Sequence, residues 1–124
     1  MSFQSDIYSI ITTDPSLNAA VEGIKFENLS ENYDITKDWV VYSFKKASQV
    51  DCLQDTAYSL YSIYIRIFSP DTIKLNALGD YIQNLIDDNS SGRIQDIEFI
   101  SDEHNVDIDK KQYSIALEFS AIYV

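Results

Sequence analysis

The stretch from Tyr58 to Leu85 constrains the fold most, because it predicts a strand that leads directly into a helix. Residues 58–68 alternate between two faces, and one face carries the bulky side chains of Tyr61, Ile63, Ile65 and Ile67. β-Branched and aromatic residues at this spacing are typical of a strand. Ser69 and Pro70 are the expected helix start, because serine can cap free backbone N–H groups and proline is tolerated in the first turn. Apolar residues at helical spacing follow and predict a helix packed on a sheet: Leu75, Leu78, Ile82, Leu85 and Ile86.

Before this stretch, the sequence predicts a helix and a further helical turn. Residues 3–13 carry an apolar stripe at helical spacing, and Asp14-Pro15 ends it. Residues 16–21 suit a short second helical turn, with Gly23 in a left-handed conformation at its end.

Two strands and two loops are expected between Gly23 and Tyr58. Residues 24–29 alternate briefly and predict a short strand, whereas the polar segment 30–38 predicts a loop. Trp39–Phe44 is a continuous apolar run of strand length, so we expect it to be buried on both faces. Residues 45–55 are polar and lack periodicity, which predicts a long loop.

The C-terminal part predicts a hairpin. Apolar residues between Ile94 and Ile100 indicate one strand, and residues 102–111 form a charged connector. Residues 113–123 then show the clearest two-residue period in the chain.

The predicted order is helix, strand, strand, strand, helix, strand, strand. This order predicts an α+β fold, with a single mainly antiparallel β-sheet, two helices packed on one face and a C-terminal β-hairpin. No internal repeat or linker divides the sequence, so we expect residues 1–124 to form a single domain.

The charge balance limits the classes of partner. The chain has 20 acidic and 9 basic residues and a formal net charge of −11. Binding to nucleic acid through a broad basic patch is therefore not expected. No uninterrupted apolar stretch approaches the roughly 20 residues of a membrane-spanning helix, and the start of the chain lacks the pattern of a signal peptide. The single cysteine excludes an internal disulfide and fits a reducing cytoplasm.

The sequence offers weak candidates for catalysis. His104 is the only histidine and Cys52 the only cysteine. They could form a catalytic dyad, but nothing local supports one, and the default expectation is an ordinary thiol and a solvated imidazole. Asp87-Asp88 and Glu98 are better explained as a helix end and a solvent-side strand residue than as an acid–base pair. We expect no catalytic residue and no enzymatic activity.

One segment has the spacing of a cation site. Asn105, Asp107 and Asp109 alternate like the start of a calcium loop, but the turn glycine and the closing glutamate are missing. Charged hairpin tips are usually solvated. We therefore expect no metal site and no cofactor.

Two features favour a contact surface. The second face of the strand at residues 58–68 carries Leu60, Tyr64, Arg66 and Phe68, and either another helix covers this face or it meets a protein partner. The predicted loop at residues 45–55 contains Val50, Cys52 and Leu53, and hydrophobes in a polar loop usually pack against something.

The order of elements resembles the tail-terminator, or tail-completion, proteins of long-tailed bacteriophages. The resemblance covers nearly the whole chain and rests on length, element order and patterned strands. The matching features are the helix end at Asp14-Pro15, the turn through Gly23 into Ile24-Lys25-Phe26, the strand Trp39–Tyr42, the strand Tyr61–Phe68 before a helix, and a hairpin of Ile97-Glu98-Phe99 with Tyr113–Phe119. The long polar segment 30–38 departs from the family pattern.

The resemblance implies a structural virion protein in the neck region of the tail, assembled in the host cytoplasm. Such subunits form a ring, typically a hexamer, that caps the head-proximal end of the tail tube and ends its polymerisation. The implied partners are further copies of the chain, which can be monomeric when free, the tail-tube protein and the head-completion or connector protein. DNA would pass through the ring without specific binding.

The resemblance also gives roles to individual residues. Tyr58, Tyr64, Arg66 and Leu53 are the candidates for contacts between subunits, which in a ring join two different surfaces. Asp51 and Asp55 are the candidates for acidic side chains that face the channel, where carboxylates repel DNA phosphates.

Other functions remain open. A head-closure or connector protein of the same neck would share many of these features. An acidic monomeric inhibitor or DNA mimic would carry its carboxylates along one extended face, whereas the predicted elements scatter them through loops. A small ligand-binding domain would need a concave apolar pocket with convergent polar groups.

Overall fold

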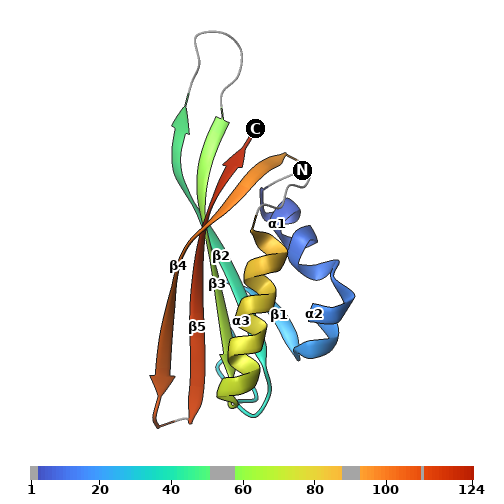
Figure 1. Ribbon diagram of the computed structural model, residues 1–124, viewed down its shortest axis with the longest axis vertical. Coiled ribbons are helices and arrows are strands. Elements are labelled where there is room, and N and C mark those ends of the chain that lie inside the picture. Colours follow the sequence, from blue (N-terminus) through green and yellow to red (C-terminus); the bar gives the residue numbers. More distant parts are fainter. Residues whose placement is uncertain (1–2, 51–57, 88–92, 110) are drawn as a thin grey trace.

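The computed structural model describes residues 3–50, 58–87, 93–109 and 111–124 (Figure 1). Its elements follow the order α1 (Phe3–Thr12), α2 (Pro15–Ala20), β1 (Gly23–Phe26), β2 (Trp39–Val50), β3 (Tyr58–Ser69), α3 (Thr72–Ile86), β4 (Ile94–Asp107) and β5 (Gln112–Tyr123). The five strands form one sheet in the order β1-β2-β3-β5-β4. Only the β1–β2 pair is parallel. The α+β class and the C-terminal hairpin are confirmed, with the short helix α2 in addition to the two main helices.

The helices lie on one side of the sheet, and the core fills the space between the two layers (Figure 1). Ile63, Ile65 and Ile67 of the central strand β3 are fully buried, so the predicted apolar face of this strand is confirmed. Helix α3 covers them with the expected stripe, in which Ile82 and Ile86 are fully buried. The alternation of apolar and polar residues along β3 therefore decides which face of the sheet receives the helices.

An aromatic cluster attaches α1 to the sheet. The Phe3 ring stacks on Tyr61 with a centroid distance of 3.9 Å. It also meets the edges of Phe44 and Tyr123 at 5.0 and 5.3 Å. Edge-to-face and offset aromatic contacts of this kind add to the area buried, so the first helical residue fixes where α1 lies on the sheet.

Two segments predicted to be loops are strands. β2 continues to Val50, so the predicted loop at 45–55 is wrong for residues 45–50, and residues 51–55 lie outside the described residues. The predicted connector at 102–111 is also wrong for residues 102–107, which pair with β5 as the second half of β4. Both segments lie beside strands of twelve residues, whose backbone groups need partners along their whole length regardless of side-chain polarity.

Two local predictions at element ends are corrected. Gly23 is the first residue of β1, not a left-handed helix end. A Cβ at this position would lie 2.9 Å from Trp39 Cζ3, so close packing explains the glycine. The N-cap of α3 is Asp71, not Ser69: Asp71 Oδ1 accepts a hydrogen bond from the Ile73 amide at 2.9 Å. The Ser69 hydroxyl instead accepts from the Asp71 amide at 3.1 Å and is buried.

Candidate interaction surface

The sheet face opposite the helices, here called the outer face, is the candidate interaction surface. On β3 it carries the residues that alternate with the buried isoleucines, including Tyr64 and Arg66. Three transverse rows of paired residues form its middle: Lys25–Val41–Arg66–Ala116–Glu103, Ser43–Tyr64–Glu118–Ser101 and Lys45–Ser62–Ser120–Glu98. Within the described residues, no helix covers these rows (Figure 1).

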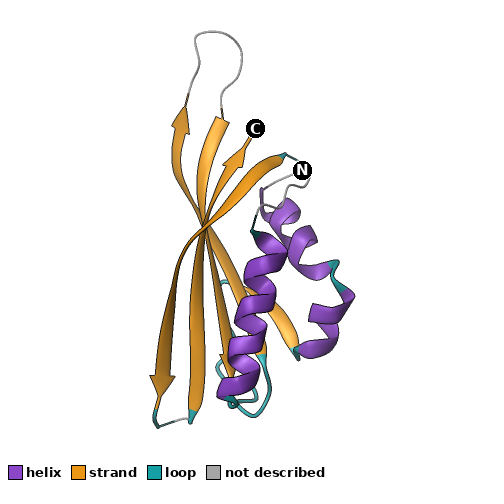
Figure 2. Cartoon of the chain, viewed as in Figure 1, coloured by secondary structure: helices purple, strands orange, loops and turns teal. Residues whose placement is uncertain are grey.

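One end of the outer face is covered by the segment between β1 and β2, drawn in teal at the lower end of the sheet (Figure 2). The Tyr33 ring packs near Trp39 and Phe68, with centroids at 6.3 and 6.4 Å. Its hydroxyl donates to Gln112 Oε1 at 2.5 Å. The Trp39 indole N–H donates to the Asp34 carbonyl at 2.8 Å. These contacts hold the segment against one end of the sheet. In the row nearest to it Val41 is also buried, whereas the charged residues at the ends of the rows are exposed.

The predicted contact residues on β3 share the outer face. Tyr64 is 37% exposed and Arg66 is exposed, while Tyr58 is half-buried at the start of the same strand. The Arg66 guanidinium crosses β2 to donate to the Glu27 carbonyl at 2.9 Å, and it lies 5.7 Å from the Phe68 ring centroid. This contact holds the cation in place on the surface. The fourth predicted contact residue, Leu53, lies outside the described residues.

The charges of the sheet are sorted by strand. In the order β1-β2-β3-β5-β4, the strands carry formal charges of +1, +2, +1, −1 and −5. β4 has five acidic residues and neither Lys nor Arg: Asp96, Glu98, Asp102, Glu103 and Asp107. β1 and β2 have only the three lysines Lys25, Lys45 and Lys46. The expectation that the acidic residues are scattered through loops is therefore wrong for these five.

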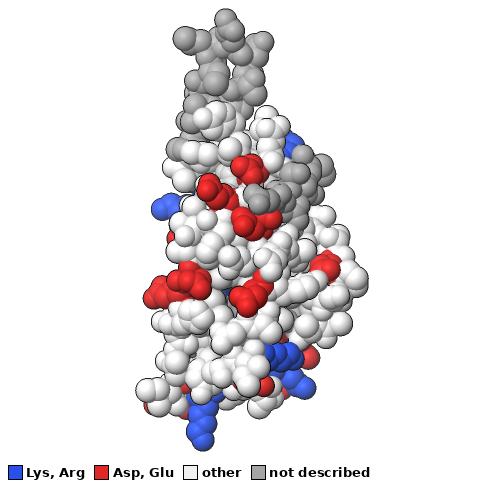
Figure 3. Space-filling model, in the orientation of Figure 1, with Lys and Arg blue, Asp and Glu red and all other residues white. Residues whose placement is uncertain are grey.

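The helix-bearing side has its own distribution of charge. Figure 3 shows acidic side chains over the middle of this side and a cluster of basic side chains near its lower end. Lys74 of α3 forms an ion pair there with Asp38, at 2.5 Å. This pair joins the start of α3 to the end of the segment that covers the outer face.

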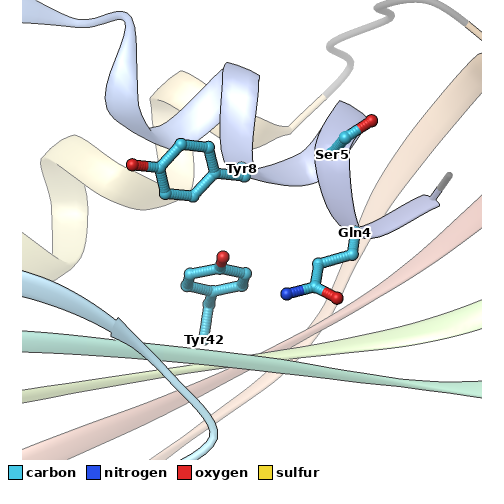
Figure 4. Close-up of a pocket in the computed structure, with 4 residues that line it drawn as sticks. All are labelled: Gln4, Ser5, Tyr8 and Tyr42. Atoms are coloured by element: carbon cyan, nitrogen blue, oxygen red, sulfur yellow. The ribbon is translucent and has the colours of Figure 1, made fainter. Parts of the chain in front are cut away.

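A pocket of about 320 Å³ lies between α1 and β2. Figure 4 shows Gln4 and Tyr8 of α1 extending over Tyr42 of β2, with Ser5 pointing away from Tyr42. Burial raises the pKa of the Tyr42 hydroxyl, against a smaller opposing effect of a hydrogen bond with Gln4. At neutral pH the hydroxyl therefore stays protonated.

The weak catalytic and metal candidates are not assembled into a site in the described part of the chain. His104 is exposed on β4, with Nε2 3.3 Å from Asp102 Oδ2, and Cys52 lies outside the described residues. Asn105 and Asp107 belong to a paired strand, so the predicted resemblance to a calcium loop is wrong. No group of three or more His, Cys, Asp or Glu side chains within residues 3–50, 58–87, 93–109 and 111–124 is arranged to hold a metal ion.

The remaining acidic candidates have separate places. Asp87 ends α3 and its Oδ1 accepts from the Phe99 amide at 3.0 Å, which joins α3 to β4. Glu98 is exposed, as predicted. Asp88 and the two channel candidates, Asp51 and Asp55, lie outside the described residues.

Sequence reasoning predicted the first half of β4 but missed the second half, because residues 102–107 have no apolar period. The available signal was the length of its partner: the alternating run at residues 113–123 needs a neighbour of similar length. None of the described helices is long and apolar enough to span a membrane.

Comparison with known proteins adds a structural likeness. No protein-family model matches the sequence, and no curated protein matches it either. The fold is similar to that of a chain in the solved structure entitled "Virion of native gene transfer agent (GTA) particle", with a TM-score of 0.71 and 15% sequence identity. The match covers 98% of this chain and 94% of that chain. At this identity the likeness establishes a shared fold over the full length of both chains.

Proposed function

We propose that the chain is a structural protein of a phage-like virion, and that it forms the ring that caps the head-proximal end of a tail tube. The observation that carries this proposal is the match of fold, over 98% of the chain, with a component of a gene transfer agent virion. The resemblance of the element order to tail terminators supports the same role. A hexamer is the expected ring.

The surface of the molecule supports assembly as its mode of action. The middle of the outer face has no helical cover in the described residues, and it presents Tyr64 and Arg66, residue types that are enriched at protein interfaces. The strands at the two edges of the sheet carry opposite charge, positive on β1 and β2 and negative on β4. A molecule with two different, complementary edges can form heterologous contacts, in which one edge binds the other edge of the next copy. Such contacts generate a ring when the rotation from copy to copy closes.

Such a ring would stop tube growth by geometry alone. One end of the ring would bind the last ring of tube subunits, and the other end would offer a different surface that the tube protein cannot extend. That second surface would receive the head connector. With a net charge of −11 per copy, the assembly would also repel DNA phosphates and let DNA pass.

The direct test is polymerisation of the partner tail-tube protein with increasing amounts of this chain. We expect shorter tubes, each with additional density at one end in electron micrographs. Unchanged tube lengths and bare ends would contradict the tail-terminator role. Binding to the isolated connector with no effect on tubes would instead identify a head-closure protein.

One observation favours a second candidate, a DNA mimic. The five acidic residues of β4 follow one strand, as a mimic of a phosphate backbone requires. Against it, Lys25, Lys45 and Arg66 lie on the same face and would be repelled by the basic site of a DNA-binding protein. A mimic would displace DNA from such a protein as a monomer, and a titration followed by fluorescence anisotropy of labelled DNA measures this.

A further inference from the structure

The two edges of the sheet are open. β1 has four residues and pairs only with residues 39–42 of β2, so within the described residues β2 has no strand neighbour on that side from Ser43 onward. β4 is the last strand at the other side, and fourteen residues long. We call β1 together with residues 43–47 of β2 the basic edge, and β4 the acidic edge.

The charges that define these edges are accessible. Lys25 and Lys45 on the basic edge are exposed, as are Glu98 and Glu103 on the acidic edge. None of these four side chains takes part in an ion pair among the described residues. Backbone groups without a strand partner and these four exposed charges are the two features by which one sheet edge can recruit another.

The opposite charges also lie level with each other. Lys25 and Glu103 are the two ends of one transverse row, and Lys45 and Glu98 are the two ends of another. The sheet therefore presents the same two-row spacing in lysines at one edge and in glutamates at the other. Two copies placed side by side bring Lys25 next to Glu103 without sliding along the strands. Lys45, which lies one strand farther in, is then level with Glu98.

We propose that neighbouring copies of this chain associate edge to edge, with the acidic edge of one copy against the basic edge of the next. The ring itself comes from the proposed function, on which this inference rests. The inference adds which surfaces of neighbouring copies are in contact. Two acidic edges would repel each other, as would two basic edges, so the charges select the heterologous pairing.

Charge reversal tests the pairing. Glu98→Lys with Glu103→Lys changes the net charge from −11 to −7, because each substitution adds two units, and it puts a lysine at both ends of the two charged rows. Lys25→Glu with Lys45→Glu changes the net charge to −15 and leaves both edges acidic. The matched control is Glu31→Lys with Asp80→Lys, which also gives −7 but lies in the covering segment and on α3.

Self-association is measured by sedimentation velocity and native mass spectrometry from about 1 μM to about 1 mM, and by cross-linking on tube ends. Each edge variant should associate at least about tenfold more weakly than the wild type, since like charges replace complementary ones. The control should associate as the wild type does. Circular dichroism and thermal unfolding establish that each variant is folded.

Two rescue experiments make the result specific. A mixture of the two edge variants should associate, because one has lysines and the other has glutamates at both ends of the two charged rows. The chain with all four substitutions keeps the net charge of −11 and exchanges lysine and glutamate at the ends of the two charged rows, so it should associate with itself. Recovery in both cases excludes misfolding as the cause of the loss.

Three outcomes would overturn the pairing: wild-type chains that never associate in solution or on tubes, edge variants that assemble like the wild type, or rescue that fails in both experiments. Edge variants that still form rings on tube ends would overturn the pairing and leave the proposed function intact. Complementation without any effect on tubes would support the pairing and contradict the tail-terminator role.

Discussion

At the scale of single residues, Trp39 joins two parts of the molecule. It is the only tryptophan in the chain, it packs against the backbone of Gly23 in β1, and its indole N–H holds the segment that covers the outer face. A glycine at position 23 lets the ring approach the strand closely. The short strand β1 and the covering segment are therefore fixed by the same side chain.

Gly23→Ala should disturb this contact. The new Cβ would lie 2.9 Å from Trp39 Cζ3, so the ring must move, and we expect a loss of stability of about 1–2 kcal/mol. Urea unfolding measures the loss, and the emission of the single tryptophan should change in the folded state. Glu22→Ala, which changes the exposed residue next to Gly23, should leave the stability and the tryptophan emission unaltered. An unchanged emission in Gly23→Ala would contradict the close packing.

Asp34 should titrate below its ordinary value. Hydrogen bonds from the Thr36 hydroxyl and then from the Thr36 amide, at 2.6 and 2.9 Å, lower the pKa of this carboxyl, and the charge of Lys37 adds to the effect. Carboxyl chemical shifts followed by NMR during an acid titration should place its pKa below 3.8. Thr36→Ala should bring the pKa back towards that value, because it removes the largest cause.

The lowered pKa has a consequence for acid stability. The folded chain binds this proton less readily than the unfolded chain, so the ionised carboxylate stabilises the fold fully above the ordinary pKa. The stabilisation is lost as the pH falls through the lower folded value. Asp34→Asn should therefore reduce stability at neutral pH, and its difference from the wild type should shrink in strong acid. A difference that grows in acid would contradict the assignment.

At the scale of elements, the start of α3 depends on Asp71. Its carboxylate accepts from the amides of Ile73 and Lys74, two of the donors that a helix leaves free at its N-terminus. Asp71→Ala should cost about 1 kcal/mol of unfolding free energy, measured in urea. Asp71→Asn keeps an acceptor and should cost only a few tenths of that. Equal losses in the two variants would exclude the cap as the cause.

The elements with strong periodicity could be predicted from the sequence. The stripes of α1 and α3 and the alternation of β3 and β5 each bury one face, so local pattern and tertiary packing agree. The second halves of β2 and β4 could not be predicted in this way. The side chains of residues 45–47 and 102–107 are exposed, and the strand conformation there depends on backbone pairing with β3 and β5.

The candidate surface could be predicted only in part. Tyr64 and Arg66 were placed on the face opposite the buried isoleucines by the two-residue period alone, and the structure puts both on the outer face. The sorting of charge between the edges could not be predicted, because it depends on strand order. β4 follows α3 in the chain but lies beyond β5 in the sheet, farthest from the lysines of β1 and β2.

At the scale of the whole molecule, two electrostatic effects oppose each other in assembly. Copies with a net charge of −11 repel at long range, whereas the edges attract at contact. Salt screens the long-range repulsion between copies. The screening length is about 30 Å at 0.01 M salt and about 3 Å at 1 M. The two effects therefore respond to different ranges of ionic strength.

Self-association should accordingly pass through a maximum with salt. We expect it to strengthen from about 0.01 M to about 0.15 M NaCl as net repulsion is screened, and to weaken towards about 1 M as the edge contacts are screened too. Sedimentation velocity at fixed protein concentration measures this. Self-association of the Lys25→Glu, Lys45→Glu variant should strengthen steadily with salt, because salt screens only repulsion between its copies.

The level placement of the charged rows has a consequence for the form of any assembly. Lys25 matches Glu103 and Lys45 matches Glu98 at equal heights along the strands. Copies paired in this register would not be shifted along their strands relative to one another. An assembly with no rise from copy to copy forms a ring when its rotation closes.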